Sequence, residues 1–212
     1  MAYTTNLYVI AAICGNFWQE STVNPGIWEN LTVGAPGYGL GQWTDNPPIV
    51  ERRTALFNYL DSHGYSRDSG DGQLEFLIYE DVWNKPGPST VAPSIYDTLT
   101  QYLESDLTDL TFLTLEWMYH WEGIDDDSEE TRISAANSFY NVFVNDDGTR
   151  NPWYASNSYL SHVQAESNAL LIKDFFLGET PPEPPDPPFP PFIRRGDGLP
   201  LWIKYKLTKG EL

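Results

Sequence analysis

The chain has 212 residues, a formal net charge of −18 at pH 7 and an aromatic content of 15%. This length suits one domain with a substantial core, and so acidic a chain is not expected to bind nucleic acid, whose phosphates attract lysine and arginine. No apolar run approaches the length of a membrane span, and no basic region precedes the first apolar stretch to make a signal peptide. The three histidines show no metal-ligand spacing, so neither a metal nor another cofactor is expected. The single cysteine, Cys14, excludes an internal disulfide and is expected in the core.

The first predicted element is an apolar helix from about residue 7 to residue 19. Its apolar residues recur at helical spacing, at Leu7, Ile10, Ala11, Cys14, Phe17 and Trp18. Glu20 comes at the end of this apolar face, directly before residues that break the helix. A carboxylate beside large apolar side chains loses hydration, which disfavours its ionised form and suits it to donate a proton near neutral pH. Taken alone, such a glutamate is more often a solvated residue of a surface helix.

A second motif, Gly37 to Trp43, has three glycines within five residues and predicts a tight β-hairpin. Leu40 and Trp43 are its apolar members. Gln42 is the one residue there whose side chain has both an amide donor and a carbonyl acceptor. Alone, this motif indicates no more than a turn between two short strands.

Apolar periodicity and stop signals predict six further helices. Their expected ranges are residues 49–63, 71–83, 93–103, 108–121, 128–144 and 158–177, with a turn-rich break at 84–88. The helix over 108–121 is strongly apolar and is expected to be the buried central helix of the domain.

An acidic run, residues 125–130, precedes the helix expected over 128–144. A calcium loop would need alternating oxygen ligands and a central glycine, which this run lacks. A capping box between Asp127 and Glu130 is the favoured interpretation, because acidic side chains stabilise the start of a helix.

The composition changes after Gly178. Residues 181–192 alternate proline pairs with Glu183, Asp186, Phe189 and Phe192, a pattern typical of polyproline II. The last twenty residues, 193–212, hold five basic and two acidic residues, with aromatic side chains among them. The sequence therefore predicts three parts: a folded domain over 1–178, a polyproline linker over 179–192, and a basic, aromatic docking tail over 193–212 for an acidic partner.

The two motifs together resemble the phage tail lysozyme family. In that family Gly-Asn, Glu-Ser, Asn-Pro and Gly-Tyr-Gly-Leu-x-Gln-Trp occur in this order, as they do here between residues 15 and 43. The pattern is also similar to goose-type lysozymes and soluble lytic transglycosylases, although Gly41 stands where those proteins have methionine. A looser similarity continues through Trp121-Glu122 to Val144, and none extends beyond Gly178.

This resemblance implies an α+β, predominantly helical, lysozyme-like fold with one small β-hairpin. It also implies a glycosidase that cleaves the linkage between N-acetylmuramic acid and N-acetylglucosamine in peptidoglycan. Glu20 would be the general acid and Gln42 would line the sugar cleft. The residues expected near the substrate besides Gln42 are Ser21, Tyr38, Trp43 and Glu122, although core packing suits the two aromatic residues nearly as well.

The second catalytic group stays open. Goose-type enzymes have an aspartate two places after the hairpin glutamine, where this chain has Thr44, with Asp45 one place later. Asp45 could activate water in an inverting hydrolase, or Thr44 could hold the water, as a threonine does in another group of phage lysozymes. With neither, the substrate's own hydroxyl could attack, as in a lytic transglycosylase. Asp45 also begins an ordinary turn.

The net charge bears on where such an enzyme would act. Most cell walls are anionic, so an acidic enzyme is better delivered by a larger assembly than by diffusion. We therefore expect a protein carried on the phage tail to digest the host wall at entry, with glycan strands and, through 181–212, other virion tail proteins as partners. An endolysin held in the host cytoplasm until lysis is an alternative. A non-catalytic virion structural or wall-binding protein is another.

Overall fold

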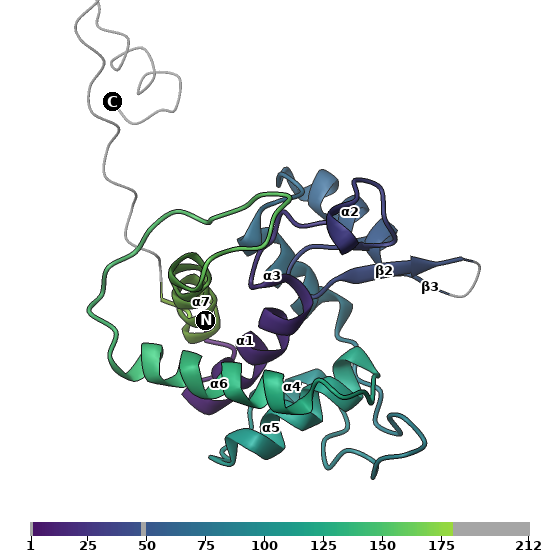
Figure 1. Ribbon diagram of the computed structural model, residues 1–212. Coiled ribbons are helices and arrows are strands. Elements are labelled where there is room, and N and C mark those ends of the chain that lie inside the picture. Colours follow the sequence, from purple (N-terminus) through teal and green to yellow (C-terminus); the bar gives the residue numbers. More distant parts are fainter. Residues whose placement is uncertain (1, 48–49, 180–212) are drawn as a thin grey trace, which may run out of the picture. The chain divides into compact units, whose positions relative to one another are not determined.

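The structure, a computed structural model, describes residues 2–47 and 50–179 (Figure 1). All the elements that it describes belong to one compact unit. Nearly all of the predicted linker and the whole docking tail, residues 180–212, lie outside the described residues.

The described chain is mainly helical. Its α-helices are α1 (Leu7–Ser21), α2 (Arg52–His63), α3 (Gly70–Glu80), α4 (Leu99–Leu103), α5 (Leu110–Trp117), α6 (Glu129–Val144) and α7 (His162–Leu177). A 3-10 turn, η1 (Glu29–Leu31), follows α1, and a π-helical segment, η2 (Met118–Glu122), continues α5.

Three short strands complete the fold: β1 (Gly37–Tyr38), β2 (Trp43–Asn46) and β3 (Val50–Glu51). They form an antiparallel sheet in that order, in which β1 and β2 are the arms of the hairpin and Tyr38 pairs with Trp43. The predicted α+β class, predominantly helical with a small hairpin, is confirmed.

Helix α1 is the buried centre of the fold. Every residue from Val9 to Phe17 is buried, and α5, α6 and α7 pack against this helix (Figure 1). The prediction that the helix over 108–121 holds this position is wrong, since α5 exposes Thr111 and is buried along part of its circumference. Small side chains on α1 let several helices approach it at once, which the larger side chains of α5 do not allow. Cys14 lies in this core, as predicted.

Gly15 sets how closely α6 approaches α1. A Cβ atom at this position would lie 2.6 Å from the backbone oxygen of Arg132 and 2.7 Å from the Cβ of Ala136. Such distances are too short for any residue with a side chain, so the close crossing of the two helices depends on this glycine. The crossing brings Arg132 next to the last turns of α1.

Two helices are shorter than predicted because the backbone at one end has another conformation. Helix α2 starts at Arg52, because Val50 and Glu51 pair with β2 instead of joining the helix. Helix α3 ends at Glu80, since Asp81 adopts a left-handed conformation with φ of 44°. The apolar pattern alone extended both helices by about a turn.

The N-terminal caps correct the other helix starts. Thr98 caps α4, which therefore begins at Leu99 and not near residue 93. Ser161 forms a capping box with Gln164 and starts α7 at His162. The capping box predicted for Asp127 and Glu130 is not formed, because Asp126 accepts hydrogen bonds from Ser128 and the helix starts after that turn. A capping side chain accepts a hydrogen bond from a free backbone N–H group in the first turn, and this fixes the residue at which the helix begins.

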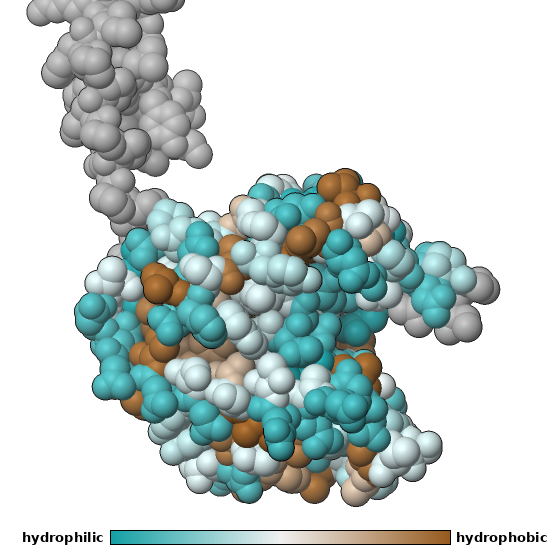
Figure 2. Space-filling view, in the orientation of Figure 1, coloured by the Kyte–Doolittle hydropathy of each residue, from teal (hydrophilic) through white to brown (hydrophobic). Residues whose placement is uncertain are grey.

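Polar residues cover most of the face shown in Figure 2, with apolar residues in separate patches. Within residues 2–47 and 50–179, no helix combines the length and apolarity that crossing a membrane requires. The same residues contain no group of three or more His, Cys, Asp or Glu side chains that could hold a metal ion.

Candidate active site

The end of α1 is fastened to the hairpin through Ser21. Its hydroxyl is buried and donates a hydrogen bond to the backbone oxygen of Leu40 (2.8 Å). Thr22 and Val23 then take left-handed conformations, with φ of 54° and 58°, which turn the chain away from the helix axis. Ser21 was predicted to contact substrate, but its hydroxyl is buried and its proton is donated to the backbone oxygen of Leu40.

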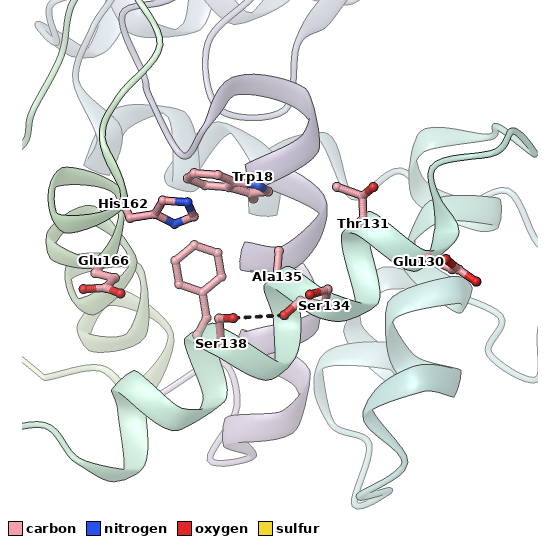
Figure 3. Close-up of a pocket in the computed structure, with 9 residues that line it drawn as sticks. Trp18, Glu130, Thr131, Ser134, Ala135, Ser138, His162 and Glu166 are labelled. Carbon is pink, nitrogen blue, oxygen red and sulfur yellow. Dashed lines mark hydrogen bonds between the residues drawn. The ribbon is translucent and has the colours of Figure 1, made fainter.

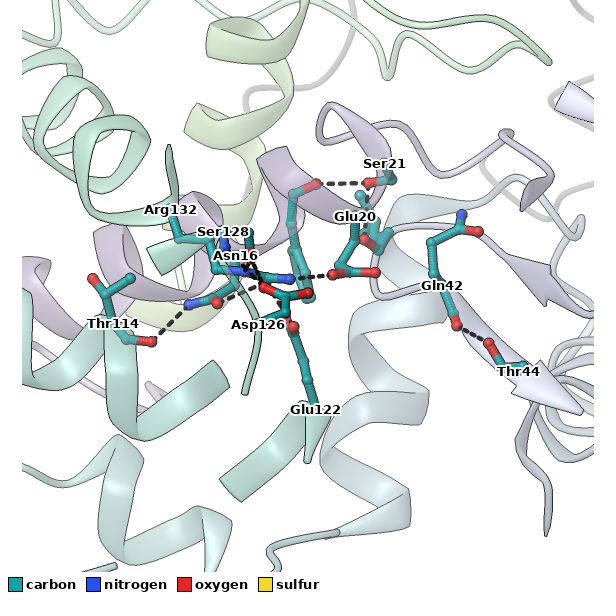
Figure 4. Close-up of polar contacts among 12 residues, drawn as sticks. Asn16, Glu20, Ser21, Gln42, Thr44, Thr114, Glu122, Asp126, Ser128 and Arg132 are labelled. Carbon is teal, nitrogen blue, oxygen red and sulfur yellow. Dashed lines mark hydrogen bonds and ion pairs between the residues drawn. The ribbon is translucent and has the colours of Figure 1, made fainter. Parts of the chain in front are cut away.

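Glu20 lies on the last turn of α1 and is paired with Arg132 of α6. The distance from Arg132 Nη2 to Glu20 Oε1 is 2.5 Å, and the glutamate side chain is 22% exposed. The sequence predicted large apolar side chains beside this carboxyl group. The structure instead gives it a buried cationic partner from a helix more than a hundred residues further along the chain (Figure 4).

The guanidinium of Arg132 is 1% exposed and held on several sides. Asn16 donates its amide protons to the backbone oxygens of Ala12 and Thr114, so its Oδ1 faces Arg132 Nη1 at 2.9 Å. Arg132 Nε donates to Ser128 Oγ at 2.8 Å. The Gly-Asn pair thus provides the close helix crossing and an oriented acceptor for the arginine.

Glu122, at the end of η2, also binds Arg132. Its Oε2 lies 2.6 Å from Arg132 Nη1, and its side chain is 6% exposed. Burial, together with the charge of Glu20, raises the pKa of Glu122 well above its usual range, although Arg132 opposes this shift. Glu122 therefore lies next to the shared arginine (Figure 4), which differs from the predicted place beside the substrate.

A cavity of about 240 Å³ lies in front of Glu20. The end of α1, the segment around η1 and the hairpin all contribute to it, together with one residue of the loop before α7. Its lining residues are Gln19, Glu20, Ile27, Trp28, Glu29, Asn30, Gln42, Thr44 and Tyr159. The structure thus brings together three of the predicted site residues, namely Glu20, Gln42 and Thr44.

Gln42 and Thr44 hold the hairpin side of this cavity. Gln42 has a left-handed backbone with φ of 45°, and its Nε2 donates to the backbone oxygen of Gly39 at 3.0 Å. Its Oε1 is buried and has no hydrogen-bond partner among the described residues. Thr44 Oγ1 donates to the backbone oxygen of Gln42 at 2.7 Å. Both side chains therefore line the cavity while donating hydrogen bonds to backbone oxygens.

The methionine position of the related families is occupied from another element. A Cβ atom on Gly41 would lie 2.5 Å from Cη2 of Trp121, so the indole fills the space that a side chain would need. Trp121 therefore occupies the space next to Gly41 where the related families have a methionine side chain.

Asp45 does not line the cavity, and its carboxylate is bound by residues of α2. Its carboxylate forms an ion pair with Arg53 (2.8 Å) and accepts hydrogen bonds from the backbone and side chain of Thr54. Burial alone would raise the pKa of Asp45, but the Thr54 hydrogen bonds and the Arg53 charge outweigh burial and lower it. The alternative in which Asp45 turns inward does not match these contacts.

The two aromatic residues predicted as cleft walls belong to the core. Trp43 is fully buried and donates its Nε1 proton to Glu80 at 2.8 Å. Tyr38 is 5% exposed and packs edge-on against Trp28 and Phe57. Of the two open interpretations for these rings, the structure favours core packing.

Two charged residues of this region were not predicted as site residues. Glu29 lines the cavity, and its Oε2 accepts a hydrogen bond from the backbone nitrogen of Gly37 at 3.0 Å. No local motif marks it. Arg132 did have a signal, because it falls at helical spacing on the same face as Ala135, Ala136 and Phe139, all of which are buried. A cation on the apolar face of a helix requires a buried acidic partner.

A larger cavity, of about 380 Å³, lies between α1, α6 and α7 (Figure 3). Trp18 stacks on His162 there, with ring centres 4.5 Å apart, and Glu130 and Glu166 contribute to its walls. Neither Glu20 nor Gln42 lines it. The smaller cavity is therefore the candidate active site, because it collects the groups that carry the chemistry.

A carboxyl group at the end of a buried helix, facing a cavity walled by a glutamine-bearing hairpin, is the arrangement of a lysozyme-like protein. The model of the phage tail lysozyme family matches residues 5–143, and the chain belongs to this family. Its fold is therefore lysozyme-like. The predicted family is confirmed.

A curated relative supports the connection to phages. The chain is 41% identical over 73 residues to Morphogenesis protein 1 of Bacillus phage B103. This match covers 34% of the chain and 18% of that relative, so the chain corresponds to a minor part of the relative's length.

Proposed function

We propose that this protein is a peptidoglycan glycosidase that cleaves the β-1,4 linkage between N-acetylmuramic acid and N-acetylglucosamine, with Glu20 as the general acid. The observation that carries this proposal is the position of Glu20, partly exposed at a cavity that it shares with Gln42 and Thr44. Membership of the phage tail lysozyme family supports the same activity.

Cleavage of a glycosidic bond needs a proton for the leaving oxygen and a group that supports the other face of the sugar. Glu20 supplies the proton in this proposal, and the arginine that binds its Oε1 restricts the orientation of the carboxyl group. Gln42 lies on the hairpin opposite and binds the sugar through its amide group.

Glu29 is the second carboxyl group of this site in our proposal. It lines the cavity with Glu20, whereas Asp45 is held by Arg53 and Thr54 outside the lining. The hydrogen bond from the backbone nitrogen of Gly37 keeps the Glu29 carboxylate at the hairpin. Glu29, assisted by the Thr44 hydroxyl, would orient the attacking water. Without such a water, the same Glu20 would serve a lytic transglycosylase.

The activity is tested by Glu20→Gln with purified peptidoglycan. We expect unchanged thermal unfolding and a loss of wall-degrading activity of about 100-fold or more, the usual contribution of a general acid. Glu130→Gln, the same substitution on the surface of α6, should retain activity. Mass spectrometry of the sugars released by the wild type separates the reducing ends of a hydrolase from the anhydro ends of a transglycosylase. Full activity of the Glu20→Gln variant would exclude the assignment.

We further propose that the protein acts from the phage tail during entry. The family description and the net charge of −18 support this, since an acidic enzyme is poorly suited to reach an anionic wall by diffusion. A tail-borne enzyme copurifies with washed particles, whereas an endolysin remains in the cleared lysate.

A further inference from the structure

We propose that Glu20 and Glu122 share a single proton across the guanidinium of Arg132, and that Glu122 is the positioning residue that keeps this proton available to Glu20. This inference rests on the proposed function for its catalytic consequence. The shared proton itself rests on the geometry alone.

The first observation is that one cation serves two carboxyl groups. Arg132 Nη2 contacts Glu20 Oε1 at 2.5 Å and Arg132 Nη1 contacts Glu122 Oε2 at 2.6 Å. The other partners of this guanidinium, Asn16 Oδ1 and Ser128 Oγ, are neutral. With both carboxyl groups ionised, the cluster would carry an excess negative charge.

The second observation is the burial of this cluster. Arg132 is 1% exposed, Glu122 is 6% exposed and Glu20 is 22% exposed, so water screens the excess charge poorly. Two carboxyl groups that share such a site do not both ionise readily, and one of them retains a proton. The raised pKa of Glu122, caused first by burial and then by the charge of Glu20, agrees with this charge balance.

The third observation is an unsatisfied oxygen. Glu122 Oε1 is buried and has no hydrogen-bond donor among the described residues. A buried polar atom without a partner is uncommon in a folded protein. A proton on either carboxyl group supplies a donor within the cluster that Arg132 brings together, whereas two carboxylates supply none.

Other charged groups on the surrounding elements have partners of their own. These pairs are Asp126 with Ser128, Glu129 with Tyr119, Glu116 with His120, Asp125 with Thr90 and Arg52 with Glu80. Asp127 and Glu130 are exposed to solvent. Within the described residues, therefore, Arg132 is the one cation that contacts the two glutamates.

The catalytic consequence follows from the charge balance. When the proton leaves Glu20 for the glycosidic oxygen and the carbon–oxygen bond breaks, water adds its hydroxyl group to the sugar and its proton restores the pair. Between turnovers the single negative charge of the pair neutralises Arg132, so the pair as a whole retains one proton that can pass to Glu20.

The test is Glu122→Gln, which removes the charge and keeps an oxygen for Arg132. We expect the basic limb of the pH–activity profile to move to lower pH by about one unit or more, because Glu20 then faces the arginine alone. Activity should fall at neutral pH and recover on acidification. Glu130→Gln should leave the profile in place. An unchanged profile in Glu122→Gln would refute the proposal, as would a loss of activity that is equal at every pH.

A second measurement does not depend on activity or on the stability of the variant. Carbon-13 NMR can follow the ionisation of each glutamate in wild-type protein that is labelled at the glutamate carboxyl groups. Exposed glutamates ionise with a pKa of about 4.3, and we expect one carboxyl group to stay protonated well above that pH. In Glu20→Gln no glutamate carboxyl group should stay protonated in this way, or the pH at which it ionises should change strongly. Simultaneous ionisation of all glutamates would overturn the shared proton. A retained proton in a protein without glycosidase activity would overturn only the proposed function.

Discussion

Arg132 and the residues around it determine what the carboxyl group of Glu20 can do. The arginine is buried, oriented by Asn16 and bound to two glutamates, so it fixes the position of Glu20 and its electrostatic surroundings together. A carboxyl group placed only among apolar side chains would be protonated but free to rotate. The ion pair with Arg132 restricts the rotation of the carboxyl group. The negative charge of the pair offsets the positive charge of the arginine, which would otherwise favour loss of the shared proton.

At the same scale, Glu29 and Asp45 can be separated by matched substitutions. We predict that Glu29→Gln lowers glycosidase activity by about 100-fold or more, because Glu29 shares the cavity with Glu20. Asp45→Asn should lower activity by less than about tenfold but should reduce the free energy of unfolding, by about 1–3 kcal/mol, since it weakens the bonds to Arg53 and Thr54. Kinetics on purified peptidoglycan and urea unfolding of both variants check this. The reverse order of activities would favour Asp45 as the second carboxyl group.

At the scale of the elements, the site depends on the crossing of α1 and α6. Glu20 and Asn16 come from α1, Arg132 comes from α6, and Gly15 lets the two backbones approach closely enough for their contacts to form. The hairpin is attached to the same end of α1 through Ser21. A change in the helix crossing should therefore alter the activity as well as the free energy of unfolding.

We predict that Gly15→Ala destabilises the protein by about 1–3 kcal/mol, the usual cost of an added methylene-sized group in a packed core. It should also reduce activity by more than the fraction unfolded explains, because the displaced α6 withdraws Arg132 from Glu20. Chemical unfolding and kinetics at a temperature where the variant is fully folded measure the two effects. Ser134→Ala, on the exposed side of α6, is the control and should change neither. Wild-type activity in folded Gly15→Ala would show that the crossing does not position the site.

At the scale of the whole molecule, the net charge of −18 opposes contact with an anionic wall. Repulsion between like charges is screened over about 10 Å at 0.1 M salt and more strongly above this concentration. An enzyme that a larger assembly holds against the wall avoids this barrier, whereas the free protein does not.

We therefore predict that the isolated protein digests intact cell walls several-fold faster when salt is raised from about 0.01 M to about 0.15 M. Its activity on short, soluble glycan fragments should change little over the same range, because such fragments carry few charges and the extended anionic wall is absent. Initial rates on both substrates at matched pH give the comparison. A rate on intact walls that falls with salt would indicate an attractive basic surface, contrary to this account.

Features that depend on neighbouring residues could be predicted from the sequence. The apolar spacing of α1, its end at Glu20-Ser21 and the glycines of the hairpin are local patterns, and together they predicted the helical class, the family and the pairing of Glu20 with Gln42 in one cavity. The predicted helix starts were less accurate, because side-chain caps such as Ser161 compete with apolar periodicity.

The contacts between side chains that are distant in the sequence depend on how the helices and the hairpin pack. Arg132 reaches Glu20 across 112 positions of sequence, Glu29 joins the cavity without any motif, and Asp45 binds Arg53 outside the cavity lining. Trp43 is directed into the core by the packing of the hairpin. These outcomes depend on helix crossings and on the balance of charge in a buried site. Both are properties of elements distant in the chain, and no local pattern of residues encodes them.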